Sequence, residues 1–368
     1  MAKIGLVTIY QVPNYGSVLQ CYATQKVLTA LGHDCRIIRY KFPNEWHYNN
    51  GLKRSSSVKK IIRKFFPSKK TWVLNDFRKK HYDFTPKYDS LKELCRENWD
   101  DYDYFVVGSD QVWNTRFTCG DKFFLLSFAP DEKKRFAVAS SFASKHLPER
   151  FHVTFKAELT KFAAISIREN NGIKIIKDEL SINKPIKVIL DPTLLLSKDE
   201  WLSINNGFKT IPRRPYILFY MWTYAFEPRP YIYELTRYFQ EKLRCDVIAL
   251  EGYEENHYTQ LIRMQNKTSA SIEEFIDLFF NAELVITSSF HGTAFSLNFG
   301  KPFISIVPNN TEDDRQTSLI KEFGLNSCIA KIGQDISSIN PFYDVTNEQT
   351  KLEELRVSSL AWIKENIK

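Results

Sequence analysis

A short polar stretch after an apolar run has the residue types of an anion-binding loop. The segment 283–287, whose middle is apolar, favours a buried strand, and the residues after it include Ser288, Ser289, His291, Gly292 and Thr293. The pattern predicts a loop and then a helix whose first N–H groups could bind a phosphate or a carboxylate, with Gly292 leaving room for the ligand. His291 could give that ligand a proton or hydrogen-bond it. A capped helix with a packed histidine explains the same residues, and both interpretations stay open.

An arginine at the end of another predicted strand indicates a second anion contact. Arg168 directly follows the apolar segment 163–167. A guanidinium in that place can hold a phosphate or a carboxylate through two parallel hydrogen bonds. A surface ion pair with the neighbouring Glu169 is the alternative interpretation.

A third stretch has the composition of a sugar site. It follows the predicted strand 104–107 and contains an acid, two amides and an indole: Asp110, Gln111, Trp113 and Asn114. The polar groups could bind sugar hydroxyls, the Trp113 ring could stack on the sugar, and Asp110 could act as the base towards an attacking hydroxyl. A buried tryptophan beside an Asx turn explains the same composition.

The first predicted strand-to-helix loop, 11–17, contains Asn14 and Tyr15, which could contact a ligand or only form a turn. Ser17 is predicted to cap the helix that follows. The loop has no GxGxxG pattern, so dinucleotide binding is not indicated. The chain has no GxxxxGKS/T, HExxH or GxSxG pattern either, which argues against P-loop, zincin and α/β-hydrolase chemistry.

Alternating strands and helices must position these loops. The segments that we interpret as strands are 3–9, 35–40, 104–107, 135–140, 163–167, 187–190, 216–220, 246–250, 283–287 and 303–307. Helical segments separate most of them, which is typical of parallel α/β sheets. We predict two Rossmann-like domains, 1–185 and 186–345, and a C-terminal helix, 346–368, that packs back near the first domain. Because ligands bind beyond the carboxyl ends of such strands, we expect the domains to face each other across a cleft that holds the loops.

Composition limits the class of protein. The 368 residues suit two domains, and 43% hydrophobic and 14% aromatic residues exclude a disordered chain. No apolar run reaches the roughly 20 residues that span a bilayer, and the first residues lead into a strand instead of a signal peptide. The six cysteines lack metal-site spacing and are interpreted as free thiols. We expect a cytoplasmic protein with no metal and no resident cofactor.

The net charge of +8 is unevenly distributed, and residues 53–70 contain eight basic residues and no acidic one. Apolar residues recur there at helical spacing, at Val58, Ile61, Ile62, Phe65 and Phe66. The amphipathic helix that they predict could pack on the first domain or contact the anionic inner face of the cytoplasmic membrane. No recognised motif supports nucleic-acid binding.

Five stretches in chain order resemble the polysaccharide pyruvyltransferase family. They are Asn14-Tyr15-Gly16-Ser17 with Leu19-Gln20 and Tyr22-Ala23, Gly108-Ser109-Asp110-Gln111-Val112-Trp113-Asn114, Ser166-Ile167-Arg168-Glu169, Asp191-Pro192-Thr193, and Ser288-Ser289-Phe290-His291-Gly292-Thr293. The resemblance extends from residue 4 to about residue 325. It implies a GT-B-like fold, phosphoenolpyruvate as the donor substrate and a product sugar that bears a pyruvate ketal. The acceptor it implies is a sugar of a cell-surface polysaccharide or of its lipid-linked precursor. The oligomeric state stays open.

The resemblance also implies roles for single residues. The arginine and the histidine that contact the donor in the family correspond to Arg168 and His291, and His291 would protonate the donor while Asp110 acts as the base. We assign donor binding to Arg168, Ser288, Ser289, His291, Gly292, Thr293 and Arg315. We assign acceptor binding to Asn14, Tyr15, Gln111, Trp113 and Asn114. From the sequence we expect His291→Ala or Arg168→Ala to abolish turnover and to leave the fold intact.

One position departs from the family pattern. Many members have an arginine two residues before the histidine, where this chain has Ser289. Arg315 and Lys301 are candidates to replace that charge. The departure leaves two alternative functions open. One is a GT-B-type glycosyltransferase that uses a nucleotide sugar, with Glu251 holding the ribose, and the other is a non-catalytic component of a polysaccharide-assembly complex.

Overall fold

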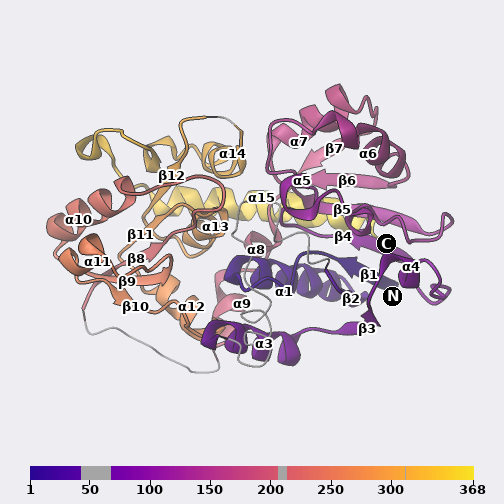
Figure 1. Ribbon diagram of the computed structural model, residues 1–368, viewed down its shortest axis with the longest axis horizontal. Coiled ribbons are helices and arrows are strands. Elements are labelled where there is room, and N and C mark those ends of the chain that lie inside the picture. The colour runs from indigo at the N-terminus through magenta and orange to yellow at the C-terminus, as the bar shows by residue number, and fades with distance from the viewer. Residues whose placement is uncertain (43–67, 206–213, 311) are drawn as a thin grey trace. The chain divides into compact units, whose positions relative to one another are not determined.

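The computed structural model describes residues 1–42, 68–205, 214–310 and 312–368 (Figure 1). Its internal contacts divide the chain into two compact units. Unit 1 comprises Met1–Ser68, Asn75–Leu195 and Leu355–Lys368, and unit 2 comprises Lys69–Leu74 and Leu196–Glu354. The amphipathic helix predicted within 53–70 lies outside the described residues, apart from 68–70.

Unit 1 contains a seven-stranded sheet in the order β3-β2-β1-β4-β5-β6-β7. The strands are β1 (Lys3–Val7), β2 (Asp34–Tyr40), β3 (Phe84–Tyr88), β4 (Tyr104–Val107), β5 (Lys134–Ser140), β6 (Ala164–Ile167) and β7 (Ile186–Val188). All neighbours pair in parallel. Because the strand order reverses between β1 and β4, the loops after these two strands diverge, which is where open α/β sheets bind ligands. The sequence-based domain boundary, 185/186, precedes β7, whose pairing with β6 places it in this sheet.

The helices of unit 1 include α1, which begins earlier than the sequence predicted. They are α1 (Tyr15–Ala30), α4 (Leu91–Leu94), α5 (Thr115–Thr118), η2 (Lys122–Leu125), η3 (Glu149–Phe151), α6 (His152–Leu159), α7 (Asn170–Lys174), η4 (Ile175–Glu179) and α8 (Pro192–Leu195). Asn14 caps α1, because its side chain accepts a hydrogen bond from the Ser17 N–H at 3.3 Å. The prediction that Ser17 is the cap is therefore wrong, and its hydroxyl is available for another partner.

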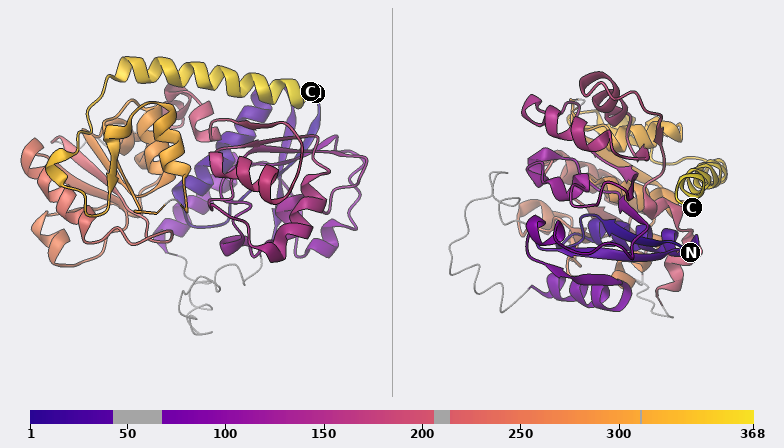
Figure 2. Two further views of the ribbon diagram at one scale, coloured as in Figure 1. Left: turned by 90° about the horizontal axis from the view of Figure 1, so that it is seen from above. Right: turned by 90° about the vertical axis from the view of Figure 1, so that its right-hand side faces the viewer.

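Two helices pass from one unit into the other. α3 (Lys69–His81) begins in unit 2 and continues in unit 1, and so does α15 (Val345–Asn366). α15 is one unbroken helix in the left-hand view of Figure 2 (yellow). In its last part, the Ser359 hydroxyl accepts a hydrogen bond from the Leu190 N–H, and Arg356 donates to the Leu194 carbonyl. These bonds hold the end of the chain against the residues that follow β7.

Unit 2 contains a six-stranded parallel sheet in the order β10-β9-β8-β11-β12-β13, with its reversal between β8 and β11. The strands are β8 (Tyr216–Tyr220), β9 (Asp246–Glu251), β10 (Gln265–Asn266), β11 (Leu284–Thr287), β12 (Phe303–Val307) and β13 (Ile329–Lys331). The helices are α9 (Lys198–Ser203), α10 (Tyr231–Leu243), α11 (His257–Leu261), α12 (Ile272–Phe280), α13 (Phe290–Asn298), α14 (Arg315–Glu322), η5 (Asn326–Cys328) and η6 (Ile336–Ser338). The prediction of two parallel α/β domains is confirmed.

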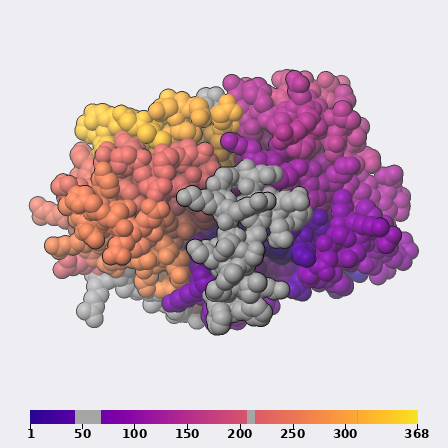
Figure 3. All heavy atoms as spheres, in the orientation of Figure 1, coloured from indigo at the N-terminus to yellow at the C-terminus, as the bar shows by residue number. Residues whose placement is uncertain are grey.

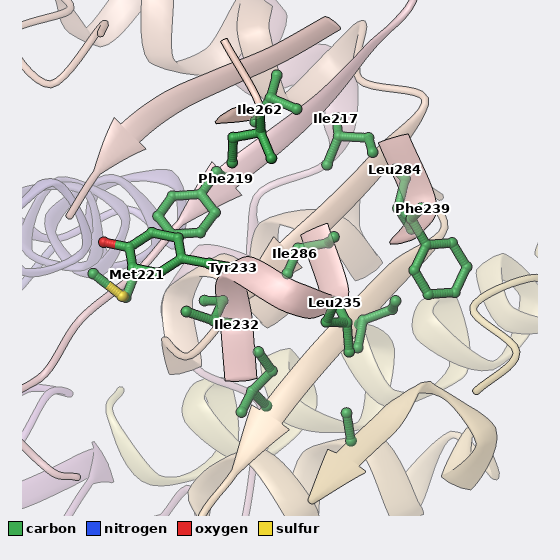
Figure 4. Packing of buried hydrophobic residues seen from close by; sticks show 14 of the residues in the cluster. Ile217, Phe219, Met221, Ile232, Tyr233, Leu235, Phe239, Ile262, Leu284 and Ile286 are labelled. Atoms are coloured by element: carbon green, nitrogen blue, oxygen red, sulfur yellow. The ribbon is translucent and has the colours of Figure 1, made fainter. Parts of the chain in front are cut away.

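One hydrophobic cluster of unit 2 lies between α10 and the sheet (Figure 4). Ile217 and Phe219 of β8 and Leu235 of α10 are fully buried. The Phe219 and Tyr233 rings stack with their centroids 5.7 Å apart. The opposite side of α10 is polar, and the segment that includes α10, α11 and α12 forms much of the face of unit 2 in the space-filling view (Figure 3, salmon and orange). Burial of one helix side therefore fixes how α10 lies on the sheet.

Leu235→Ala should destabilise unit 2 by about 2–5 kcal/mol, because the lost side chain leaves a cavity in a core that cannot fully collapse. The measurement is urea unfolding followed by tryptophan fluorescence. Leu261→Ala is a matched control, because Leu261 is 45% exposed and should cost far less. Equal losses for both variants would contradict the packing described here.

Candidate active site

Arg168 directly follows β6, and its side chain is only 1% exposed. Nη1 donates a hydrogen bond to Asp191 Oδ2 at 2.7 Å. Nη2 lies 3.6 Å from Asp110 Oδ1, and Nε lies 3.9 Å from Glu169 Oε2. Three buried carboxylates therefore surround one guanidinium, which excludes a surface ion pair between Arg168 and Glu169.

Neutral donors hold the carboxylates of Asp191 and Glu169 in place. Asp191 Oδ2 accepts from the Ser109 hydroxyl at 2.6 Å, and Oδ1 accepts from the Thr193 hydroxyl at 2.7 Å. Glu169 Oε1 accepts from the Ser141 hydroxyl at 3.0 Å and from two backbone N–H groups. Such bonds offset part of the cost of burying charge. The sequence analysis assigned no role to Asp191, although the Asp191-Pro192-Thr193 stretch was one of the signals for the resemblance.

Asp110 lies at the strand-order reversal of unit 1. Its Oδ2 accepts from the Ser17 hydroxyl at 2.6 Å, so the loop after β4 is tied to the first turn of α1. Its Oδ1 accepts from the Gln111 N–H at 2.9 Å. The Asp110 backbone has φ +73°, a left-handed conformation that aspartate tolerates better than most residues. Asp110 is 5% exposed, and its carboxylate already accepts hydrogen bonds from two donors. That Asp110 acts as the base stays a prediction.

Both aromatic acceptor candidates are packing residues. Trp113 is 1% exposed, its Nε1 donates to the Phe124 carbonyl at 3.0 Å, and its ring centroid lies 5.1 Å from that of Phe142. Tyr15 is fully buried. Neither ring offers a face to a sugar, so for Trp113 the buried-tryptophan interpretation replaces the stacking one.

The polar acceptor candidates also form local structure. Asn14 caps α1, as described above. Asn114 caps α5 by accepting from the Arg116 N–H at 3.1 Å, and it donates to Gln111 Oε1 at 2.8 Å. Binding of an acceptor by Asn14, Gln111 or Asn114 stays a prediction.

Hydroxyl groups fix the loop between β11 and α13 in unit 2. The Ser288 hydroxyl accepts from the Trp222 N–H at 2.8 Å and donates to the Trp222 carbonyl at 2.7 Å. The Thr287 hydroxyl donates to the Tyr220 carbonyl and accepts from the Ser289 N–H. The loops after β8 and β11, which flank the reversal in strand order, are thus joined by neutral hydrogen bonds.

The residues of the first turn of α13 are buried. His291 is 6% exposed, and its ring meets the Phe290 ring edge to face, with centroids 5.2 Å apart. Ser289 is the N-cap residue of α13, but its side chain does not make the usual capping bond. The Thr293 hydroxyl lies 2.9 Å from Ser305 Oγ on β12. The N-terminus of α13, a nine-residue helix, therefore lies at the carboxyl edge of the sheet beside His291. The N-terminus is the positive end of the helix dipole.

The structure requires glycine at position 292 for a different reason from the one that the sequence indicated. A Cβ atom at this position would lie 2.2 Å from Thr287 Oγ1 and 2.9 Å from Tyr220 Cδ1. The glycine therefore lets α13 approach β8 and β11 closely, and the expectation that it makes room for a ligand is replaced by this packing requirement.

Arg315 and Lys301, the two cations considered as replacements for the missing arginine, lie at opposite edges of the sheet of unit 2. Arg315 opens α14 at the carboxyl side of β12 and binds Asp313 through Nε at 2.8 Å and Nη2 at 2.5 Å. Burial lowers the pKa of Arg315, but Asp313 and Tyr224 together outweigh burial, so the net pKa is raised. Lys301 precedes β12 at the opposite edge of the sheet, and burial lowers its pKa. Lys301 therefore cannot replace an arginine beside His291.

Glu251, the residue considered for a ribose, ends β9 and forms an ion pair with Lys70. Burial raises the pKa of Glu251, and Lys70 opposes that shift. The Lys70 ammonium lies 5.1 Å from the centroid of the Trp222 ring. In the described part of the chain no three His, Cys, Asp or Glu side chains form a metal site, and no helix could span a membrane.

Comparison with solved structures shows the class of fold. UDP-GlcNAc 2-epimerase from Methanocaldococcus jannaschii matches with a TM-score of 0.53 and 15% identity, over 96% of this chain and 98% of that one. A putative UDP-N-acetylglucosamine 2-epimerase from Listeria monocytogenes matches with a TM-score of 0.51 and 11% identity, over 97% and 91%. These proteins have the GT-B fold, and the chain shares it.

The sequence places the chain more narrowly. The family described as polysaccharide pyruvyl transferase matches residues 14–310. The chain belongs to this family, which confirms the resemblance, and it is a transferase of polysaccharide biosynthesis. No curated protein matches it.

Asp191→Ala should destabilise unit 1 by about 3–5 kcal/mol, because it removes the closest partner of a buried guanidinium. For the same reason, Arg168→Ala should not leave the fold intact, contrary to the expectation from sequence. Thermal and urea unfolding measure both. Glu241→Ala, which breaks the exposed Arg237–Glu241 pair, is the control and should change stability by less than about 1 kcal/mol. Wild-type stability in Asp191→Ala would contradict the buried network.

Gly292→Ala should lower the stability of unit 2 by at least about 1–3 kcal/mol, because the new methyl group would overlap Thr287. Gly172→Ala is the matched control, since its Cβ would meet the movable end of Ile167 at 2.9 Å and alanine favours the helix. Differential scanning calorimetry compares the two. If Gly292→Ala melts like the wild type, the close packing of α13 on β11 is not as described.

Proposed function

We propose that this transferase moves a pyruvyl group from phosphoenolpyruvate to a sugar of a cell-surface polysaccharide or its lipid-linked precursor, and closes a pyruvate ketal. The family match over 14–310 carries the proposal, because it covers the segments after β4, β6 and β11, which contain Asp110, Arg168 and His291. The product would be a ketal-bearing sugar and the by-product inorganic phosphate. No resident cofactor is part of the proposal.

Donor binding in the proposal depends on groups that suit a small molecule with two anionic groups. Phosphoenolpyruvate carries its phosphate ester and its carboxylate on the same carbon, C2. The N-terminal N–H groups of α13 and the hydroxyl of Ser289 could bind one of these groups. Arg168 and Arg315 already face carboxylates, so we expect them to contribute only where an anion displaces or shares those partners.

The proposed chemistry is acid–base catalysis at C2. An acid, for which His291 is our candidate, protonates the methylene carbon and leaves an oxocarbenium-like centre at C2. A sugar hydroxyl attacks C2 and loses its proton to a base, for which Asp110 is our candidate. A second hydroxyl of the same sugar then displaces phosphate from C2, loses its own proton and closes the ketal. Positioned acids and bases typically contribute about 10²–10⁴-fold each.

Two other functions have less support. A nucleotide-sugar glycosyltransferase would use Glu251 to hold a ribose, yet Glu251 is paired with Lys70. A non-catalytic role in a polysaccharide-assembly complex rests on Ser289 alone, while the buried His291 and the ordered β11–α13 loop are what an active protein would keep. For a lipid-linked acceptor we further propose a cytoplasmic protein that contacts the inner face of the membrane.

His291→Ala should lower phosphate release from phosphoenolpyruvate by about 10²–10⁴-fold, because it removes the proposed acid. The assay measures acceptor-dependent phosphate release with lipid-linked acceptors that end in galactose, mannose or N-acetylhexosamine. A thermal shift with phosphoenolpyruvate alone reports donor binding separately, since a ligand of the native state must stabilise it.

Thr317→Ala, on the neighbouring helix α14, is the control and should keep wild-type turnover. Near-normal turnover of His291→Ala would remove His291 from the mechanism. Stabilisation by a nucleotide sugar, with no response to phosphoenolpyruvate, would favour the glycosyltransferase instead.

A further inference from the structure

One side of α3 presents an indole among lysines. Of the tryptophans that the structure describes, only Trp72 is exposed, with 61% of its surface accessible. Lys69, Lys79 and Lys80 of the same helix are exposed as well. We name these four residues the α3 face.

The α3 face lies opposite the packed side of the helix. Leu74, Phe77 and Arg78 are buried, and helical spacing puts Trp72 and Lys79, which are two turns apart, on the other side. The Arg78 guanidinium is used internally, since Nη2 donates to the Val12 carbonyl at 2.7 Å. The charge of Arg78 therefore does not belong to the α3 face.

Two of the three lysines give the α3 face a net positive charge. The one acidic residue of the helix, Asp76, pairs with Lys80 at 2.6 Å. Lys69 and Lys79 have no ion pair within the described residues.

Helix stability explains only part of this composition. Lysines in the last turn interact favourably with the helix dipole, which accounts for Lys79 and Lys80. Lys69 opens the helix, where the dipole disfavours a cation, and the exposed Trp72 covers no core. In sequence the helix also continues the basic stretch 53–70, which has no acidic residue.

We propose that the α3 face docks on an anionic lipid surface. An indole with its apolar ring and N–H group suits the headgroup level of a bilayer, and the flanking lysines suit anionic headgroups. A single aromatic residue is too small for a stable protein interface, which typically buries about 1,200–2,000 Å². The inference deepens the membrane contact proposed above and rests on it, but it requires neither phosphoenolpyruvate nor pyruvyl transfer.

The test is co-sedimentation of the full chain with vesicles of equal parts phosphatidylglycerol and phosphatidylcholine, compared with pure phosphatidylcholine. We expect binding to the anionic vesicles that is lost at about 1 M salt, where the Debye length falls to about 3 Å. Lys69→Ala with Lys79→Ala should weaken binding roughly 25-fold, about fivefold per lysine. Trp72→Ala should weaken it roughly tenfold, which corresponds to burial of one large apolar side chain.

Lys92→Ala with Lys156→Ala removes the same charge from exposed positions on α4 and α6 and should change binding less than twofold. Circular dichroism should show wild-type folding for all variants, since the changed residues are exposed. Equal binding of the α3-face variants and the wild type would overturn the proposal. So would tighter binding to single-stranded RNA than to the vesicles through the same residues. The phosphate-release assay tests pyruvyl transfer independently with a soluble acceptor, so one proposal can fail without the other.

Discussion

The buried charge of Arg168 is the constraint on which the loops of unit 1 depend. A guanidinium that is 1% exposed must be surrounded by acceptors, because an unpaired charge in the interior is very costly. Asp191 and Asp110 come from segments that follow different strands, and each is in turn held by hydroxyl groups. The need to satisfy one charge therefore fixes the ends of β4 and β6, the segment after β7 and the first turn of α1 relative to one another.

In unit 2, neutral contacts stabilise the loops at the carboxyl edge of the sheet. Neutral hydroxyls join the loops after β8 and β11, and Gly292 allows α13 to lie directly on the strands. Two charged residues of this edge are paired, Arg315 with Asp313 and Glu251 with Lys70. An anion at this edge could be bound directly by helix N–H groups and by hydroxyls. It could bind one of the paired cations only by displacing that cation's carboxylate. This use of neutral groups is consistent with serine at position 289, because no contact described at this edge requires a cation there.

The sequence predicted strands and helices well and single side chains less well. The strands at 104–107, 216–220 and 303–307 lie at the residues where the sequence predicted them. The roles of Trp113, Gly292 and Lys301 were predicted from residue type in a loop or beside one. An indole in a loop can stack on a sugar or pack in a core, and only its burial, 1% exposed for Trp113, separates the two.

By itself the sequence determined the alternation of strands and helices, the two-domain α/β class and membership of the family, because these depend on local patterning and on the order of short motifs. Only the tertiary structure decided the strand order, the reversals at β1–β4 and β8–β11, and the partners of Arg168. The physical reason is distance along the chain. Ser17, Asp110 and Asp191 meet only when parallel strands from separate segments come to lie side by side. No local propensity encodes which strands become neighbours.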